Sequence, residues 1–397
     1  MAETDLGNLR VAVVHDWLSE YAGSERVVEQ MLNVFDQADV FTLVDFLPDE
    51  QRAFLGGRRP RTSYMQKLPR AAKAFRQYLA LMPHAIEQFD LGGYDLVLSS
   101  SHAVAKGVIT GPDQLHVCYC HTPIRYAWDH THEYLRGAGL DRRLKGRLAR
   151  WVLHYLRIWD ARTAAGVDRF LANSRFIARR IAKTYRREAE VLYPPVDVEG
   201  FSVGERREGF YLAAGRVVPY KRTEVLVEAF SRLLPGRRLV VIGDGPGLAE
   251  LRRGAGANVE FLGRCEHGVL RDHLQRARAL VFAAREDFGI LPVEAMACGT
   301  PVIAYGRGGA RETVIPGQTG VLFQEQTPES LADGVRRFED QAGHFDPHAV
   351  RRHAEPFSAE RFRRELRQRV SAYWSAFLAE RDAPPPRPDE SSVGIGS

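Results

Sequence analysis

Residues 210–215, Phe-Tyr-Leu-Ala-Ala-Gly, form a short apolar run that leads into a polar loop and then into a helical pattern. Residues 10–15, Arg-Val-Ala-Val-Val-His, open the first half of the chain in the same way. Strand, loop and helix in this order are the repeating unit of parallel α/β structure. Neither run alternates between apolar and polar residues, which indicates a sheet that helices cover on both faces. The sequence therefore predicts two α/β halves.

Further strands and a boundary complete this prediction. Six more apolar runs have the length of buried strands, at residues 95–99, 116–120, 169–172, 239–242, 279–282 and 301–304. The two prolines in residues 193–197, Tyr-Pro-Pro-Val-Asp, stop a helix and predict a connector. We expect two doubly wound parallel-sheet domains, residues 1–197 and 198–356. A helix at about residues 357–380 carries an apolar stripe that needs cover, and residues 382–397 have the composition of a disordered tail.

Length and composition narrow the class of protein. The chain has 397 residues, of which 45% are hydrophobic and 26% are charged, as in an ordinary globular protein of two or three domains. It has no apolar run of the ~18 residues that a membrane span needs, and residues 1–10 do not resemble a signal peptide. The four cysteines form no CxxC or zinc-ligand pattern. We expect free thiols, no metal site, no cofactor and a cytoplasmic location.

The positive charge is concentrated in the first half of the chain. The net charge is +5, from 55 Lys and Arg against 50 Asp and Glu. Residues 52–76 hold eight cations and no acid, and residues 136–187 hold fifteen cations and three acids, a surplus of twelve. This distribution suggests an anionic partner, which could be nucleic acid, a membrane surface or a phosphorylated substrate. Solvated helix faces in an arginine-rich chain explain the same counts.

Two glutamates eight positions apart form the strongest candidate for a site. Residues 286–294 read Glu-Asp-Phe-Gly-Ile-Leu-Pro-Val-Glu and follow an expected strand. Glu286 would lie in the loop at the carboxyl end of that strand, where α/β folds bind ligands. Glu294 would lie in the first turns of the next helix, and the N–H groups near Gly289 and Ile290 offer an anion site between the two carboxylates. An acidic helix N-terminus that the helix dipole stabilises is the alternative.

A cationic loop follows residues 210–215. Arg216 and Lys221 lie between this expected strand and the next helix, and two cations beside a helix N-terminus suit a diphosphate. A solvated loop is the alternative. Residues 243–247, Gly-Asp-Gly-Pro-Gly, do not complete GxGxxG, and the sequence contains no P-loop and no Asp-x-Asp motif that would hold a metal on a diphosphate.

Two loops of the first half carry further candidates. His121 follows the expected strand at 116–120 and is close in sequence to Arg125. A lone histidine is more often structural, but its place at a strand tip favours a function. Asp16 and Gly23 lie in the first strand–helix loop, where a glycine lets a ligand approach the backbone and where a plain turn is equally consistent.

Together these residues resemble the retaining glycosyltransferases of family 4, over nearly the whole chain from about Val11 to Tyr373. Residues 286–294 meet the E-x7-E motif of that family, and Arg216 and Lys221 meet its Arg/Lys pair. The resemblance implies the GT-B fold, in which two Rossmann-like domains face a central cleft. Shorter segments are similar to a narrower branch, the O-antigen mannosyltransferases of the WbaZ type, at residues 15–17, 99–106, 119–126, 173–174, 193–197, 241–246 and 286–289.

The resemblance also implies a role for each candidate. The second domain would bind the nucleotide-sugar donor and the first domain the acceptor. The catalytic residues would be His121 and Glu286. The donor would be bound, without a metal on its diphosphate, by Arg216, Lys221, Phe288, Gly289, Ile290, Leu291 and Glu294. The acceptor side would be lined by Asp16, Gly23 and Arg125.

The implied reaction moves a sugar, best assigned as mannose from GDP-mannose, to a hydroxyl of a glycan or a polyprenyl-diphosphate-linked glycan in surface polysaccharide biosynthesis. The anomeric configuration would be retained. The surplus of cations in the first half then fits the anionic inner leaflet, with the protein peripheral to the membrane. A GT-B nucleotide-sugar epimerase or a sugar phosphorylase remains an alternative. A nucleic-acid-binding protein is a more distant one, because the sequence contains no reader motif for nucleic acid.

Overall fold

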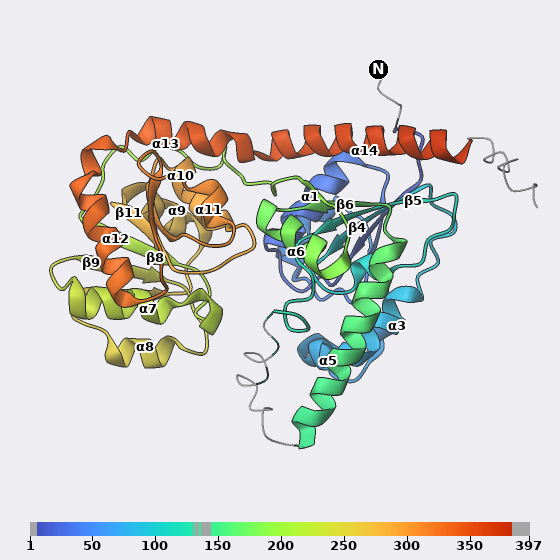
Figure 1. Cartoon of the computed structure of the whole chain (residues 1–397), viewed down its shortest axis with the longest axis horizontal. Helices are drawn as coiled ribbons and strands as arrows, with labels where there is room; N and C mark the ends of the chain where they lie inside the picture. Colours follow the sequence, from blue (N-terminus) through green and yellow to red (C-terminus); the bar gives the residue numbers. More distant parts are fainter. Residues whose placement is uncertain (1–5, 130, 132–134, 136–143, 383–397) are drawn as a thin grey trace, which may run out of the picture.

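The structure is a computed structural model that describes residues 6–129, 131, 135 and 144–382. Its described part contains two parallel β-sheets, one in each half of the chain (Figure 1). The first sheet has, in spatial order, β3 (Arg61–Thr62), β2 (Asp39–Thr42), β1 (Val11–His15), β4 (Leu96–Ser101), β5 (Leu115–Cys120), β6 (Arg169–Ala172) and β7 (Glu190–Val191). The second has β10 (Val259–Gly263), β9 (Arg238–Ile242), β8 (Phe210–Ala214), β11 (Ala279–Phe282), β12 (Val302–Tyr305) and β13 (Gly320–Phe323). The predicted fold class, with two doubly wound parallel sheets, is confirmed.

Helices follow the strands in both domains. The helices of the first domain are α1 (Gly23–Val34), α2 (Ala71–Ala74), α3 (Met82–Glu87), α5 (Leu144–Thr163) and α6 (Arg175–Tyr185). The second domain contains α7 (Thr223–Glu228), α8 (Leu248–Gly254), α9 (His267–Arg276), α10 (Ile290–Ala297), α11 (Ala310–Thr313), α12 (Pro328–Asp340) and α13 (Pro347–Ala354). The last helix is α14 (Ala359–Arg381). No helix within these described ranges combines the length and the apolar character that crossing a bilayer requires.

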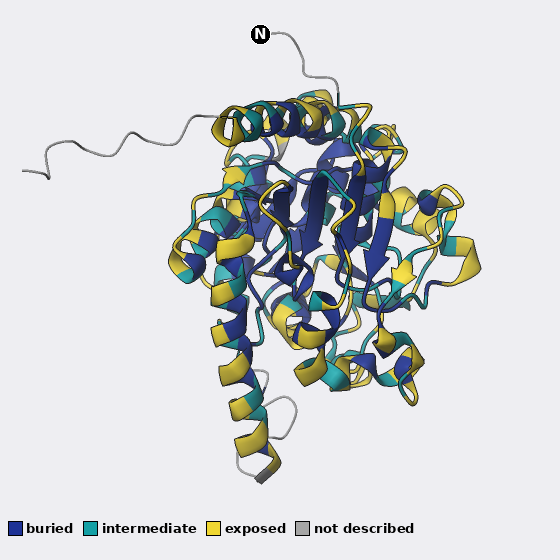
Figure 2. Ribbon diagram, turned by 90° about the vertical axis from the view of Figure 1, so that its right-hand side faces the viewer, coloured by how far each residue is buried: buried dark blue, intermediate teal, exposed yellow. Residues whose placement is uncertain are grey.

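The central strands are buried on both faces, as their continuous apolar runs predict. Every residue of β1, β4 and β5 is buried, and Figure 2 shows these strands as the dark interior of the domain. Successive side chains of a strand point to opposite faces. Val13 of β1 accordingly packs in one apolar cluster, with α1 and α14, while Val14 packs in another cluster, with α3.

The helix α14 returns to the first domain. Ser358 caps it by accepting a hydrogen bond from the N–H of Arg361, and its stripe residues Phe362, Leu366 and Val370 are fully buried in the cluster that contains β1 and α1. The chain therefore passes between the domains twice. The two crossings lie side by side, because the N–H of Val196 donates to the carbonyl of Phe357 at 2.9 Å.

Five strands were not expected from the sequence: β2, β3, β7, β10 and β13. Two of them, β3 and β7, have two residues each, and β10 is only partly buried, so neither length nor apolar content marks them. Only pairing with a neighbouring strand defines such segments. Of the predicted tail at residues 382–397, Asp382 ends α14, and residues 383–397 lie outside the described residues.

Both sheets reverse their strand order beside their first strand. β1 lies between β2 and β4, and β8 lies between β9 and β11. Open parallel sheets bind ligands at the carboxyl ends of the strands, at this point of reversal. Each domain therefore presents one edge at which a ligand is expected.

Candidate functional site

Side chains from the two domains meet at these edges. Arg26, on the first turns of α1, forms an ion pair with Glu294 of α10 at 2.8 Å. Arg125, which follows β5, forms an ion pair with Asp287, which follows β11. The side-chain oxygen of Ser174 also donates to the carbonyl of Asp287 at 2.6 Å. The predicted site residues therefore lie on two surfaces that are in contact with each other.

Lys221 and Glu286 form an ion pair, although they were predicted on separate loops. Both side chains are largely covered, at 20% and 17% exposure. Burial, together with the neighbouring cations Arg125 and Arg216, lowers the pKa of Lys221 to about 8, whereas the carboxylate of Glu286 favours the ammonium. Arg216 is exposed and forms no ion pair with any described residue. Lys221, which is poorly hydrated and has one carboxylate partner, and the exposed Arg216 beside it could together bind an anion.

The predicted helix start after Glu286 is present. Gly289 has φ of +87° and caps α10, which begins at Ile290. The first N–H groups of a helix lack partners within the helix, and those of α10 lie next to the partly buried Ile290 and Leu291 and the buried Phe288. Residues 308–309 pack closely against this turn. A Cβ on Gly309 would lie 2.2 Å from the carbonyl oxygen of Phe288. The site loop thus depends on the absence of a side chain there.

Glu294 is only 5% exposed, and its Oε1 is held by Arg26. The sequence analysis did not identify Arg26. One signal was available: a cation in the first turns of α1 opposes the helix dipole, and so needs a compensating partner. Burial works against the charge of Arg26, but the carboxylate of Glu294 outweighs it and raises its pKa. One oxygen of Glu294 remains for a ligand.

The first-domain edge holds a cluster of histidines. The side-chain oxygen of Ser100 lies 3.1 Å from Nδ1 of His15 and 2.9 Å from Nε2 of His121, so that one hydroxyl links the ends of β1, β4 and β5. Nε2 of His15 lies 3.3 Å from Glu25. A third ring, His102, lies with its centroid 6.2 Å from that of His121. Sequence analysis identified only His121 of this cluster.

The pKa values of His15 and His121 are shifted in opposite directions. Burial lowers the pKa of His15, but the hydrogen bond and the charge of Glu25 raise it above the usual value overall. Burial, with His102, His15 and Arg125 as neighbours, holds the pKa of His121 well below its usual range. A raised pKa favours the charged form of His15, in which Nδ1 donates to Ser100 and leaves the hydroxyl of Ser100 to donate to Nε2 of His121. The neutral His121 then carries its proton on Nδ1.

The three residues predicted on the acceptor side have different surroundings. Asp16 is fully buried and its carboxylate accepts four backbone N–H bonds from residues 102–105, at 2.6 to 3.0 Å. It therefore holds the loop after β4 and has no free oxygen for an acceptor. Gly23 begins α1, and a Cβ on it would lie 3.0 Å from Cδ1 of Ile290 in the other domain. Arg125 is held by Asp287.

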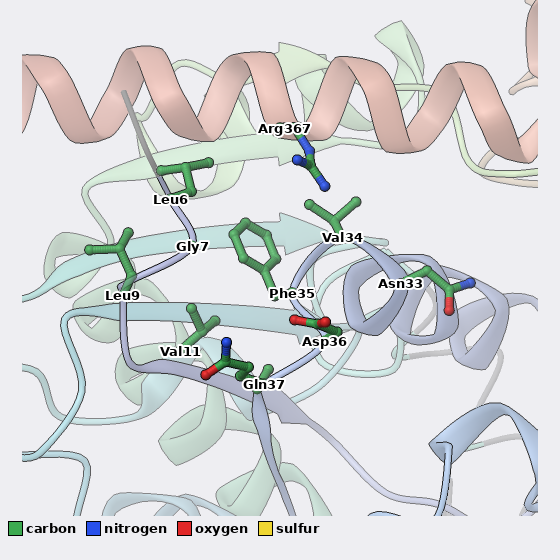
Figure 3. Close-up of a pocket in the computed structure, with 11 residues that line it drawn as sticks. Leu6, Gly7, Leu9, Val11, Asn33, Val34, Phe35, Asp36, Gln37 and Arg367 are labelled. Carbon is green, nitrogen blue, oxygen red and sulfur yellow. The ribbon is translucent and has the colours of Figure 1, made fainter. Parts of the chain in front are cut away.

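A separate pocket lies at the other end of β1, as Figure 3 shows. It has a volume of about 460 Å³ and lies between the segment before β1, the end of α1 and Arg367 of α14. Its lining includes Val11, the first residue of β1, and none of the predicted site residues. In the described part of the chain, no three His, Cys, Asp or Glu side chains are grouped so that they could hold a metal ion.

Comparison with known families matches each half of the chain separately. Residues 21–199 match the family described as Glycosyltransferase Family 4. Residues 201–354 match the family described as Glycosyl transferases group 1. The change from one to the other falls in the segment that connects the two sheets.

Two known proteins are similar to this chain over about half of its length. The chain is 32% identical over 258 residues to a D-inositol 3-phosphate glycosyltransferase of Geodermatophilus obscurus, covering 55% of each protein. It is 33% identical over 223 residues to one of Mycobacterium bovis, covering 49% of this chain and 46% of that protein. These matches thus span about half the length of the relatives.

Solved structures with the same fold cover nearly the whole chain. HepE of Anabaena, in complex with UDP and glucose, has a TM-score of 0.66 at 16% identity and covers 92% of this chain and 100% of that one. Sucrose-phosphate synthase of Thermosynechococcus elongatus has a TM-score of 0.67 at 18% identity, with the same coverage. At these identities the likeness shows the GT-B fold alone.

Proposed function

Because the chain consists largely of a Glycosyltransferase Family 4 domain followed by a Glycosyl transferases group 1 domain, we propose that it is a retaining hexosyltransferase that uses a nucleotide-sugar donor. One observation carries this proposal: the Lys221–Glu286 ion pair lies beside the first turn of α10. The neighbouring residue Asp287 forms an ion pair with Arg125 of the first-domain edge. One edge offers cations and N–H dipoles for a diphosphate. The other offers hydrogen-bonding groups for a sugar.

The donor is proposed to bind on the second domain. Lys221 and Arg216 would neutralise the diphosphate, and the N–H groups at the start of α10 would add hydrogen bonds. The arriving diphosphate competes with Glu286 for Lys221, which frees the carboxylate of Glu286 for hydroxyls of the donor sugar. The oxygen of Glu294 that Arg26 does not hold would accept from the ribose. No metal is required by this arrangement, which we propose to be metal-independent.

The chemistry places its largest charge change on the second domain. As the bond between the anomeric carbon and the diphosphate breaks, negative charge grows on the leaving oxygen, and the preorganised ammonium of Lys221 stabilises it. The acceptor hydroxyl attacks from the same face and gives its proton to that oxygen. We propose this front-face course because the buried first-domain carboxylates Asp16 and Glu25 are already engaged, by four backbone N–H groups and by His15. Neither is available as a nucleophile.

His121 is proposed to orient the donor sugar. Its neutral ring and the proton on Nδ1 suit a hydrogen bond to a sugar hydroxyl, and an imidazolium would instead compete with Lys221 for the diphosphate. Arg125 and Gly23 would line the path of the acceptor, while Asp16 would act through the loop that it holds.

GDP-mannose is proposed as the donor, as the similarity to the WbaZ-type branch implies. UDP sugars are the main alternative, because HepE, which has the same fold, was solved with UDP and glucose. The proposed acceptor is a glycan or a polyprenyl-diphosphate-linked glycan at the anionic inner leaflet, which the cations of the first domain support. Inositol 3-phosphate, which the names of the relatives contain, is the second acceptor to test.

A donor screen tests the proposal. The protein is incubated with GDP-mannose, UDP-glucose or UDP-GlcNAc, with and without each acceptor, and nucleotide release and the thermal midpoint are measured. We expect one donor to raise the midpoint by mass action and to release nucleotide only when an acceptor is present, with or without a chelator. Donor consumption without acceptor would indicate an epimerase, and stabilisation by none of the donors would contradict the proposal.

A further inference from the structure

The helix α5 presents a row of large apolar side chains to solvent. Leu148, Trp151, Tyr155 and Ile158 are 67%, 72%, 48% and 57% exposed. Spacings of three and four residues place them on one face of the helix. Figure 1 shows α5 extending beyond the body of the first domain, and Figure 2 shows exposed residues along it. Single exposed apolar residues are normal, whereas a contiguous row marks an interaction surface.

The opposite face of α5 fixes the helix to the domain. Leu153 and Leu156 are buried and pack with Ile124 in one apolar cluster. Asp160, fully buried, accepts a hydrogen bond from the indole N–H of Trp128 at 2.7 Å. The exposed row therefore belongs to an element that is packed along its other side.

The charges of α5 have a single sign on the outside. The helix carries Lys145, Arg147, Arg162 and two further arginines, and its one carboxylate is Asp160. That carboxylate is fully buried in an ion pair with Lys106 at 2.6 Å. Lys145, Arg147 and Arg162 are exposed. An apolar row with Trp and Tyr, beside exposed cations, is the pattern of a helix that lies in the interface of an anionic membrane.

We propose that this face of α5 docks the protein on an anionic lipid bilayer. The row of Leu148, Trp151, Tyr155 and Ile158 would enter the boundary between headgroups and acyl chains, and the cations beside it would contact anionic headgroups. Charge complementarity selects this occupant over a second copy of the chain, because a second α5 would bring like charges together.

The docking face is connected to the proposed acceptor side. The cluster under α5 contains Ile124 and Ala127, which belong to the segment that follows His121 and includes Arg125. A membrane bound at α5 would therefore lie against the element that supports the acceptor side. The inference rests on the proposed function for the nature of the acceptor, but lipid binding itself requires no turnover.

Vesicle co-sedimentation tests the docking face with the full chain. The wild type, a Trp151→Gln/Ile158→Gln double variant and a control Ile109→Gln/Val269→Gln are mixed with phosphatidylcholine vesicles with or without phosphatidylglycerol. Ile109 and Val269 are also exposed, at 63% and 38%, and lie outside α5. We expect the double variant to lose about tenfold or more of its partitioning onto anionic vesicles, and the control to bind like the wild type. A Lys145→Gln/Arg147→Gln variant should lose severalfold on anionic vesicles only.

Other results would overturn the proposal. Equal binding of the wild type to neutral and anionic vesicles would show that the cations of α5 do not contribute to binding. Unchanged binding of the double variant would show that the apolar row does not contribute. A wild-type dimer that the double variant abolishes, without lipid binding, would assign the row to a second copy. The thermal midpoint of each variant checks its folding. Nucleotide release with a water-soluble acceptor, measured in parallel, separates a failure of docking from a failure of the proposed function.

Discussion

The two edges that form the candidate site are built from different interactions. On the first domain, His15, Ser100 and His121 form a hydrogen-bond chain that is buried at His15 and Ser100 and partly buried at His121. On the second domain, Lys221 and Glu286 form an ion pair that is partly open to solvent. A buried hydrogen-bond chain fixes the orientation of a ring and the position of its proton. An ion pair can exchange its partner, and so one edge is preorganised while the other is ready to respond to a charged ligand.

The comparison predicts that a substitution on the second-domain edge lowers the turnover number more than a substitution on the first-domain edge does. Lys221→Ala removes the cation on which the developing charge of the leaving group depends. We expect the turnover number at saturating donor to fall on the order of a hundredfold or more, equivalent to about 2.7 kcal/mol of barrier. Steady-state kinetics with varied donor concentration measure it.

The control for this change is Lys73→Ala, which removes an exposed lysine of the first domain and should leave turnover unchanged. Lys221→Arg keeps a cation at the site and should recover part of the lost rate. Near wild-type turnover of Lys221→Ala would contradict the role given to the second-domain edge.

The contact between the edges gives the second prediction. Arg26→Gln leaves the carboxylate of Glu294, whose side chain is 7% exposed, without its cationic partner. Leaving a buried charge unpaired is costly, but Arg26 is 24% exposed, so we expect the free energy of unfolding to fall by about 1–3 kcal/mol. Urea unfolding measures this loss. The matched control is Arg232→Gln, because Arg232 pairs with Glu228 at 71% and 46% exposure, and a change within about 0.5 kcal/mol is expected there. Equal losses in both variants would indicate that the pair contributes no more than a surface contact.

The sequence predicts those parts of the fold and of the site that residues close together in the chain determine. It does not predict contacts between residues that are far apart in the chain. The central buried strands β1, β4, β5, β8 and β11 and the helix start after Glu286 are local, because a few adjacent residues determine each, and they were predicted. The Arg26–Glu294 pair joins residues 268 positions apart, and no local pattern connects them. The histidine chain requires that β1, β4 and β5 are neighbours in the sheet. That order is a property of the fold, so Ser100 and His15 were not identified beside His121.

Ser100→Ala tests the hydrogen-bonded edge. Losing the hydroxyl frees His121 to rotate and removes the donor that places its proton on Nδ1, so we expect the turnover number to fall by about tenfold, with little change in the KM of the donor. Ser99→Ala is the matched control, because Ser99 makes the same type of hydrogen bond to a histidine, to Nε2 of His116 at 2.8 Å, on the other face of β4. A similar rate loss in both variants would indicate a general packing defect rather than a role for Ser100 in orienting His121.

The smallest expected effect is the pH dependence that separates the two edges. The pKa of Lys221 is lowered to about 8, so its ammonium is retained below that pH and is lost as the pH rises through it. Because the diphosphate needs the charged form, we expect donor affinity to weaken severalfold between about pH 7 and pH 9. Lys221→Arg should bind with a nearly constant affinity over this range, because an arginine keeps its charge. Calorimetric titrations of nucleoside diphosphate at pH 7, 8 and 9 measure the effect. His121, whose pKa is held well below its usual range, stays neutral throughout and so contributes nothing to a change in this range. An affinity that weakens equally in the wild type and in Lys221→Arg would assign the titrating group elsewhere.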